Sequence, residues 1–195
     1  MNRVCSIFSP LLQFFPRLEF EALVKKHGAE RHARGFTCWG QFLAMLFCQW
    51  GPAHSLREIC GGLACGEGKL RPLGLSGAPP RSTLAYANAH RPWQLFQSVF
   101  AQLYQRWVAP VNPPRRFRFR YRRLTLDAPL LDLCASLFDG AAYKRTKGAV
   151  KLHLLLDHPG YLPQFMVITP GKRQEIEGAR RLRFQPGTIL IMDRA

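Results

Sequence analysis

The chain has 195 residues, 47% of them hydrophobic and 21% charged, which suffices for a buried core and excludes wholesale disorder. Lys and Arg number 28 against 12 acidic residues, so the net charge is +16 and the pI is near 10.4. A chain this basic is expected to bind a polyanion, most often nucleic acid and less often an acidic membrane surface.

Several features indicate a cytoplasmic protein without a membrane partner. No apolar run approaches the roughly 18 residues of a membrane span, and the N-terminus lacks the pattern of a signal peptide. The six cysteines show no CxxC spacing, so we expect reduced thiols rather than a zinc site or disulfides.

Before residue 110, apolar residues at helical spacing and clear stop signals predict an all-helical domain. A helix over 17–27 ends at Gly28, and a helix over 38–50 is capped by Thr37. The next helix begins with a capping box in which Glu58 reaches back to the amide of Ser55, and it ends at 61–62.

Two further helices are predicted over 82–90 and 93–107, after a Gly- and Pro-rich loop and on either side of Arg91-Pro92. Residues 1–110 form the helical domain, which we expect to bind DNA. Three prolines between 109 and 114 cannot continue a helix, and residues 111–121 form a basic linker.

After residue 121 the pattern predicts strands over 122–127, 149–156 and 161–169, then a short basic helix over 173–183. A continuous apolar run over 188–193 is typical of a strand covered on both faces. The fold class is therefore α/β of the α+β type: a helical domain, then over 122–195 a mixed sheet in the order β-β-β-α-β. That order places the first and fourth strands side by side in ribonuclease-H-like sheets.

Two aspartates occupy equivalent positions, because Asp127 and Asp193 each end an apolar strand. If the first and fourth strands are neighbours, both carboxylates lie at one edge of the sheet. There they could hold Mg²⁺ or Mn²⁺, and two such ions serve phosphodiester chemistry. The alternative is that each aspartate simply ends a strand or caps the next helix.

Two basic segments are candidates for contact with DNA. Residues 115–123 hold six arginines and three aromatics, which suit phosphates and bases; the candidate contacts are Arg115, Arg116, Arg118, Arg120 and Arg122. The alternative is an exposed edge strand whose charges prevent aggregation. A second cluster between the first two strands comprises Lys144, Arg145, Lys147 and Lys151, with a solvated loop as its alternative.

In the helical domain, the segment over 81–91 could enter the major groove as a helix, with Arg81, Asn88 and Arg91 facing base edges. The loop before it is far longer than the turn of a helix-turn-helix motif, so the competing interpretation is that Asn88 and His90 are simple surface or core residues. His153, on a predicted strand, is expected to be structural.

Four segments resemble the catalytic domain of bacterial insertion-sequence transposases of the group founded on insertion sequence four: Leu126-Asp127, residues 132–138, residues 147–157 and Met192-Asp193-Arg194. Residues 55–59 and 81–84 are similar to the helical domain that precedes it in many members. The resemblance covers nearly the whole chain, and its strand motifs are fairly specific as a set.

The resemblance implies an incomplete ribonuclease-H-like fold with an Asp-Asp-Glu metal site, in which Asp127 is the first carboxylate and Asp193 the second. It implies Mg²⁺-dependent hydrolysis at the ends of a transposon and attack of the freed 3′-hydroxyl on target DNA. Double-stranded DNA is then the partner, and a homodimer of the intact protein is compatible with it.

The sequence departs from the family at two points. Ala128 stands where the family usually has Ser or Thr, and the Glu of the family's Tyr-Arg-Glu-Lys type motif has no counterpart, so we expect no DNA cleavage by this chain alone. One alternative is a non-enzymatic nucleic-acid-binding module with structural aspartates. Another is a self-standing metal nuclease with a third ligand from Asp132, Asp139 or Asp157.

Overall fold

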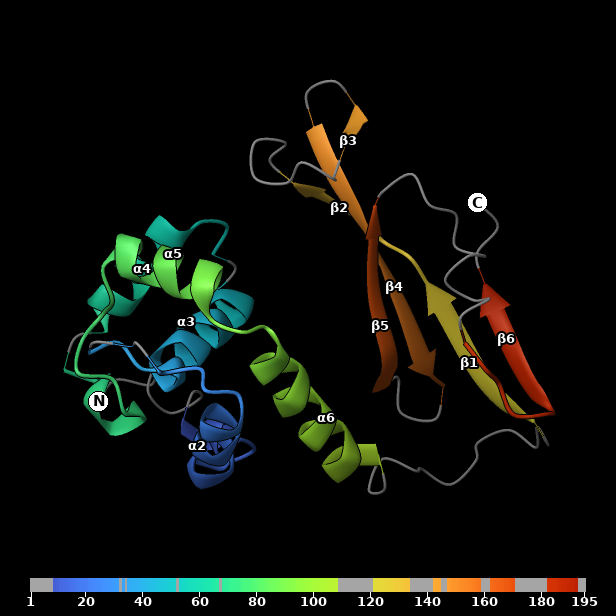
Figure 1. The fold of residues 1–195 in the computed structure, drawn as a ribbon, viewed down its shortest axis with the longest axis horizontal. Helices are drawn as coiled ribbons and strands as arrows, with labels where there is room; N and C mark the ends of the chain where they lie inside the picture. Colours follow the sequence, from blue (N-terminus) through green and yellow to red (C-terminus); the bar gives the residue numbers. More distant parts are fainter. Residues whose placement is uncertain are drawn as a thin grey trace. The chain divides into compact units, whose positions relative to one another are not determined.

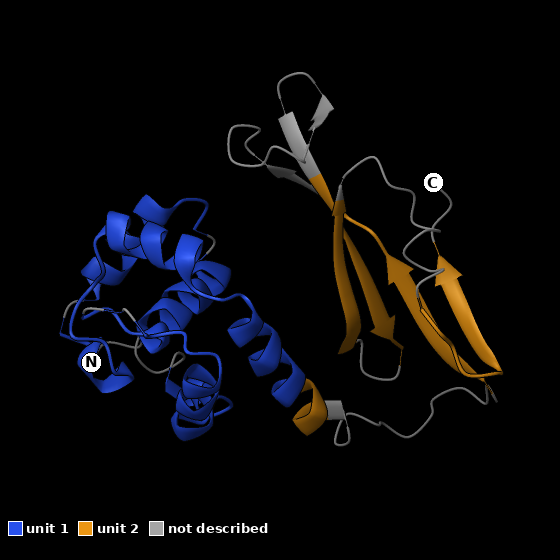
Figure 2. Cartoon of the chain, in the orientation of Figure 1, with its two compact units in different colours: residues 1–103 blue, residues 104–195 orange. Residues whose placement is uncertain are grey.

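The chain forms two compact units, residues 1–103 and 104–195, in the computed structural model (Figure 2). Helices fill the N-terminal half and a mixed β-sheet follows, which confirms the α+β class (Figure 1). The described residues are 9–31, 33, 35–51, 53–66, 68–108, 121–133, 142–144, 147–158, 162–170 and 182–192. Only the backbone is described at 108, 130–133, 142–144, 147–149 and 170.

The labelled helices follow the predicted order closely: α2 Arg17–Lys26, α3 Cys38–Trp50, α4 Leu56–Cys65, the 3₁₀ helix η1 Arg71–Leu73, α5 Arg81–His90 and α6 Gln94–Val108. No helix among the described residues combines the length and apolar character needed to cross a membrane. The thiols of Cys38, Cys48, Cys60 and Cys65 are free, and burial raises the pKa of the Cys38 thiol to about 11.

Side chains fix the starts of α3 and α4. The Thr37 hydroxyl accepts a hydrogen bond from the amide of Gly40, and the Ser55 hydroxyl accepts one from the amide of Glu58. The Glu58 carboxylate reaches back one residue further than predicted, because it accepts from the amide of His54 and from the Ser55 hydroxyl. These bonds satisfy amides that a helix start leaves without intrahelical partners.

The predicted end of α4 at 61–62 was wrong, because the helix continues to Cys65. Two glycines weaken a helix by up to about 1 kcal/mol each. The burial of Ile59 and Leu63, one turn apart and 3% and 4% exposed, offsets that cost. Tertiary packing therefore carries α4 through its glycines.

The core of the helical unit is rich in aromatic rings. Phe20, Trp39 and Phe42 contact one another with ring centroids 5.1–5.5 Å apart. Leu43, Leu84 and Leu95 are completely buried, and they join α3, α5 and α6 in the same cluster. Large rings bury much apolar area each, so this unit has a continuous core.

In the part of the chain that the structure describes, the sheet has six strands: β1 Arg122–Asp127, β2 Leu130–Leu133, β3 Ala142–Lys144, β4 Lys147–Asp157, β5 Leu162–Pro170 and β6 Thr188–Met192. All four strands predicted from the sequence are present, as β1, β4, β5 and β6. The two shorter strands, β2 and β3, were not predicted. The long strand β4 pairs antiparallel with β5 on one side and with β1 and β2 on the other. Strand β6 pairs parallel with β1, so the order across the sheet is β5-β4-β1-β6 (Figure 1).

The two faces of the sheet differ because alternate residues of a strand point to opposite sides. One face buries Leu124, Leu126 and Leu155 against a partly buried shell of Phe165, Leu182, Phe184, Leu190 and Met192. The other face leaves large apolar side chains 41–62% exposed: Met166, Ile168, Ile189 and Ile191. Strand β6 is therefore covered on one face, rather than on the two faces of which its continuous apolar run is typical.

Part of the predicted basic helix over 173–183 lies outside the described residues. Its last two residues, Leu182 and Arg183, are described and are not helical. His153 is completely buried and hydrogen-bonded through Nε2 to the Thr169 hydroxyl at 2.8 Å, which agrees with a structural role.

Candidate functional site

The first candidate site lies at the edge of the sheet where β1 and β6 end. Their parallel register pairs Leu126 with Met192, and each of these residues directly precedes one of the two candidate carboxylates in the chain. Asp127 is exposed at the end of β1, and its Oδ1 atom accepts a hydrogen bond from the amide of Ala128 at 2.9 Å. Asp193 lies outside the described residues.

A third acidic ligand does not come from Asp157. The β1–β4 register places Asp157 opposite Leu124 and Asp127 opposite Leu154, so the two carboxylates point to opposite faces and are three residues apart along β4. The proposal of Asp157 as a shared metal ligand was therefore wrong. The Asp132 side chain and Asp139 lie outside what the structure describes, and the described residues contain no group of three or more His, Cys, Asp or Glu that could hold a metal.

Asp157 instead belongs to a polar cluster with Arg122 and Gln164. Its Oδ2 atom accepts hydrogen bonds of 2.7 Å from Arg122 Nη2 and from Gln164 Nε2. The Arg122 side chain is 44% exposed, so this ion pair adds little stability, but it fixes the guanidinium beside the sheet. On the opposite face of β1, the Thr125 hydroxyl hydrogen-bonds the ring of His158 at 2.7 Å.

The lysines of the second basic cluster lie in strands rather than in a loop, and their contact with DNA stays a prediction. Lys144 ends β3 and is the register partner of Lys147 at the start of β4, while Lys151 is half-buried further along β4. Arg145 lies outside the described residues, as do Arg115, Arg116, Arg118 and Arg120.

In the helical unit, Arg81 is exposed at the start of α5, and Asn88 takes part in a hydrogen-bond network. The Asn88 Oδ1 atom accepts from Gln41 Nε2 at 2.7 Å, and its Nδ2 donates to Met45 Sδ at 3.8 Å. These bonds connect α5 to α3 and give Asn88 a structural role. Its contact with a base edge stays a prediction.

Of this network, Gln41 was missed from the sequence, whereas Arg91 was a candidate for contact with base edges. Gln41 is only 2% exposed, and its Oε1 atom accepts from Arg91 Nη1 at 3.1 Å. Arg91 also donates to the backbone carbonyls of Phe36 and Thr37, and so ties the end of α5 to the start of α3. A glutamine inside the otherwise apolar run of α3 was the available signal, because a buried amide needs partners.

The exposed side of α5 carries an aromatic pair that sequence analysis also missed. The rings of Tyr86 and His90 are stacked, with centroids 3.9 Å apart and an angle of 17° between the planes. The spacing of four residues was the available signal, because it places two side chains next to each other on a helix. A hollow of about 520 Å³ adjoins the pair and is also lined by Arg31, Thr83 and Arg91.

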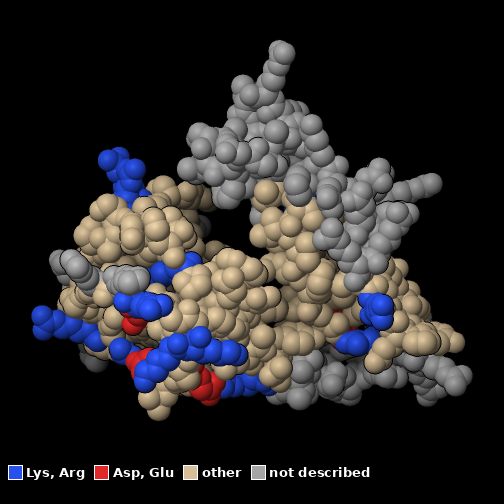
Figure 3. Space-filling view, in the orientation of Figure 1, with Lys and Arg blue, Asp and Glu red and all other residues tan. Residues whose placement is uncertain are grey.

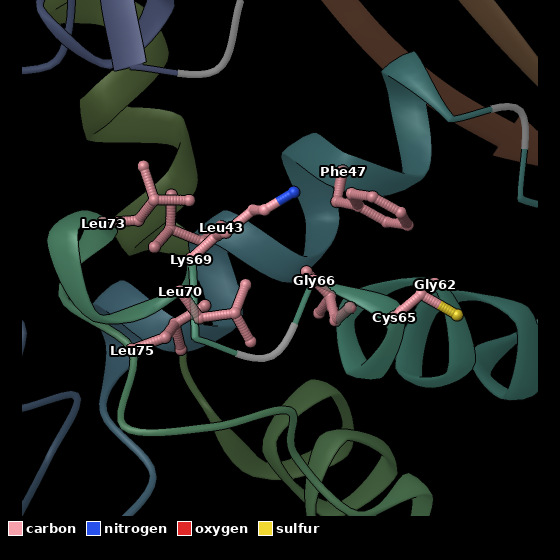
Figure 4. A pocket seen from close by; sticks show the side chains of 10 residues that line it. Leu43, Phe47, Gly62, Cys65, Gly66, Lys69, Leu70, Leu73 and Leu75 are labelled. Atoms are coloured by element: carbon pink, nitrogen blue, oxygen red, sulfur yellow. The ribbon is translucent and has the colours of Figure 1, made fainter. Parts of the chain in front are cut away.

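A second, smaller cavity of about 280 Å³ lies between α3 and α4 and the segment through η1 (Figure 4). Leu43, Leu70, Leu73 and Leu75 line it, and Lys69 is the charged residue of the lining. The Phe47 ring covers Gly62 at its rim, where a β-carbon would come within 2.6 Å of the ring. The cavity has too few polar groups to orient a substrate for chemistry.

The charge of the helical unit is mostly basic on the face seen in Figure 3, where Lys and Arg side chains cover more of the surface than Asp and Glu. In the sequence, no acidic residue occurs between Glu67 and Asp127, whereas eleven Lys and Arg residues do. This long stretch without acidic residues includes the whole of α5 and α6.

Comparison with known families gives one match, which covers less than half of the chain. Residues 4–76 match the family model described as a domain of unknown function, DUF4372. This domain is an N-terminal domain of transposase-like proteins. No curated protein and no solved structure matches the chain.

Proposed function

We propose that the chain is a DNA transposase fragment of the insertion-sequence Asp-Asp-Glu type, related to the group founded on insertion sequence four. In this proposal, residues 1–110 bind DNA at the transposon ends, and the sheet contributes Asp127 and Asp193 to a metal site. The proposal rests above all on the parallel pairing of β1 with β6, whose register ends at Leu126 and Met192.

The pairing supports the proposal because Leu126 and Met192 are register partners, and a candidate carboxylate is the next residue after each of them. Covalent geometry allows about 3.8 Å between successive α-carbons, and paired strands are about 4.8 Å apart. We therefore expect the carboxylates that follow these two parallel strands to lie at the same edge of the sheet. The same order, with the three antiparallel strands β5, β4 and β1 followed by parallel β6, is that of ribonuclease-H-like sheets.

The residues present fit a hard divalent cation at this edge. Carboxylate oxygens are the ligands that Mg²⁺ favours, and Asp127 is exposed on a strand end that β4 and β6 hold on both sides. When bound, such ions activate an attacking oxygen and stabilise the leaving one at phosphorus. In this proposal the sheet positions the two carboxylates, and the basic surface of the chain binds the phosphate backbone of DNA.

The domain match supports the proposal that the chain is related to transposases. Residues 4–76, in the helical unit, match a domain that occurs N-terminally in transposase-like proteins. The net charge of +16 gives this chain the electrostatic attraction that a DNA-binding protein needs.

A second candidate function is a nucleic-acid-binding module whose aspartates are structural. One observation favours it: Asp127 Oδ1 accepts a hydrogen bond from the amide of Ala128. A carboxylate that only caps the end of its strand would form such a bond. Ala128 itself is 7% exposed and, unlike the Ser or Thr usual in the family, offers no hydroxyl. The two functions share DNA binding and differ in metal binding.

DNA binding is tested by fluorescence anisotropy of a labelled double-stranded oligonucleotide across a salt series. If the basic residues displace counterions from about six or more phosphates, affinity falls by roughly 1,000-fold between 50 and 200 mM salt. Arg81→Ala removes one exposed charge and is expected to reduce the salt slope by about one. An affinity that does not change with salt contradicts DNA binding through these residues.

A further inference from the structure

One face of α5 is exposed along its length and carries side chains that the proposed function has not used. Ser82, Tyr86, Ala89 and His90 are spaced by four, three and one residues, which places them on one side of the helix. Leu84 and Ala87 are buried on the other side. The structure thus gives α5 one side for the core and one side for solvent.

The two rings on the solvent side form a preorganised pair. Tyr86 is 65% exposed, and its ring lies parallel to that of His90 at 3.9 Å. The His90 Nδ1 atom lies 2.9 Å from the Tyr86 carbonyl oxygen, and because a carbonyl only accepts, Nδ1 carries a proton. This bond fixes the ring and leaves Nε2 available to a ligand, so the pair loses little side-chain entropy when it binds.

The surroundings of the pair favour a polyanion. Arg31 and Arg91 line the adjoining hollow of about 520 Å³, and the exposed Arg81 begins the same helix. No acidic residue occurs in α5 or within 13 residues on either side of it in the sequence. The small side chains of Ser82 and Ala89, next to the rings, allow another backbone to approach the helix closely.

We propose that the Tyr86–His90 pair is the DNA contact of the helical unit, through which α5 binds double-stranded DNA. The inference rests on the proposed function and identifies the surface that performs it. The Tyr86 ring packs against sugar and base edges, and its hydroxyl and His90 Nε2 hydrogen-bond phosphate or base. Asn88 remains in its network with Gln41 and positions the helix rather than reading a base.

The test measures the affinity of the full chain for a double-stranded oligonucleotide by anisotropy at one fixed salt concentration. Tyr86→Ala and His90→Ala are each expected to weaken binding about 10-fold, the effect of losing one good groove contact. Ala89→Glu leaves both rings in place but adds a negative charge to the same face, and it is also expected to weaken binding. Tyr86→Phe keeps the stacked ring but loses the hydrogen bond of the hydroxyl, so its loss of affinity should be smaller than that of Tyr86→Ala.

Trp93→Ala is the matched control, because Trp93 is also aromatic and 65% exposed but does not belong to the pair. Its affinity should equal that of the wild type, and circular dichroism should show native helix content in every variant. Equal losses in Trp93→Ala, or wild-type affinity in Tyr86→Ala, His90→Ala and Ala89→Glu, overturn the inference while the proposed function stands. A wild-type chain that does not bind DNA overturns both.

Discussion

The helical unit and the sheet differ in how completely their apolar side chains are covered. Around Phe20, Trp39 and Phe42 the helices enclose a continuous core. The sheet buries one face, through Leu124, Leu126 and Leu155, and exposes large apolar residues on the other. The stability of the first unit therefore comes from packing on all sides, and that of the second comes from one face and the strand ladder.

In the proposed function the two units also differ in where their candidate residues lie. The proposed DNA contact of the helical unit, Tyr86 and His90, lies on an exposed helix face supported by a packed core. The proposed metal ligand Asp127 lies at the end of β1, which pairs with β4 and β6. Rigid elements hold both candidate sites, and rigid elements position side chains more precisely than loops do.

The largest expected effect separates the two faces of the sheet. Leu126→Ala removes a side chain that is 1% exposed, and it should destabilise the sheet by about 3 kcal/mol. Ile191→Ala, on the neighbouring strand but the open face and 42% exposed, should cost about 0.5 kcal/mol. Hydrogen exchange of the β4 amides measures both effects. Equal costs would mean that the open face is covered in solution.

A smaller effect tests the packing between α3 and α4. Gly62→Ala places a β-carbon 2.6 Å from the Phe47 ring, whereas Gly61→Ala meets no atom within 4 Å. Gly61→Ala should therefore stabilise the helix by up to about 1 kcal/mol. Gly62→Ala should be less stable than Gly61→Ala by about 1–3 kcal/mol.

Urea unfolding followed by tryptophan fluorescence measures both glycine variants, because all four tryptophans lie within residues 39–107. The double variant Phe47→Leu with Gly62→Ala should recover part of the loss, since the smaller side chain gives room. If the two single variants have the same free energy of unfolding, the Phe47 ring leaves room for a β-carbon at residue 62.

The smallest effect is a pH dependence at the start of α4. Hydrogen bonds from the His54 amide and the Ser55 hydroxyl lower the pKa of the Glu58 carboxyl. A carboxyl with a lowered folded-state pKa contributes stability above its unfolded pKa of about 4.3, and this stability is lost as pH falls through the folded value. The difference in melting temperature between wild type and Glu58→Gln should therefore shrink below about pH 4. A constant difference from pH 3 to 7 contradicts the assignment.

Local signals predicted most of the elements. Thr37 and Ser55 marked helix starts because their hydroxyls accept amide hydrogen bonds, and the alternating apolar residues of β1 and β4 marked strands. The end of α4 was missed because the burial of Leu63 outweighs the cost of two glycines, and that burial depends on residues distant in the sequence. The short strands β2 and β3 depend on pairing with β4 and have little pattern of their own.

The candidate site was predicted in part. The element order predicted that the first and fourth of the predicted strands lie side by side, and the structure pairs them, in parallel, as β1 and β6. The partners of individual polar groups did not follow: the hydrogen bonds of Asp157 to Arg122 and Gln164 depend on strand register, and the network of Arg91 and Gln41 depends on the packing of α5 on α3. To predict the stacked pair on α5 from the sequence, one must know both that the segment is helical and which side of the helix is exposed.

Calorimetric titration of the chain with Mn²⁺ tests most directly whether residues 127 and 193 form a metal site. The account predicts binding by the wild type that is lost in both Asp127→Asn and Asp193→Asn. Asp157→Asn is the matched control, because this carboxylate points to the opposite face and is held by Arg122, and it should leave binding intact. Binding that survives in Asp127→Asn, or is equally lost in Asp157→Asn, would contradict the account.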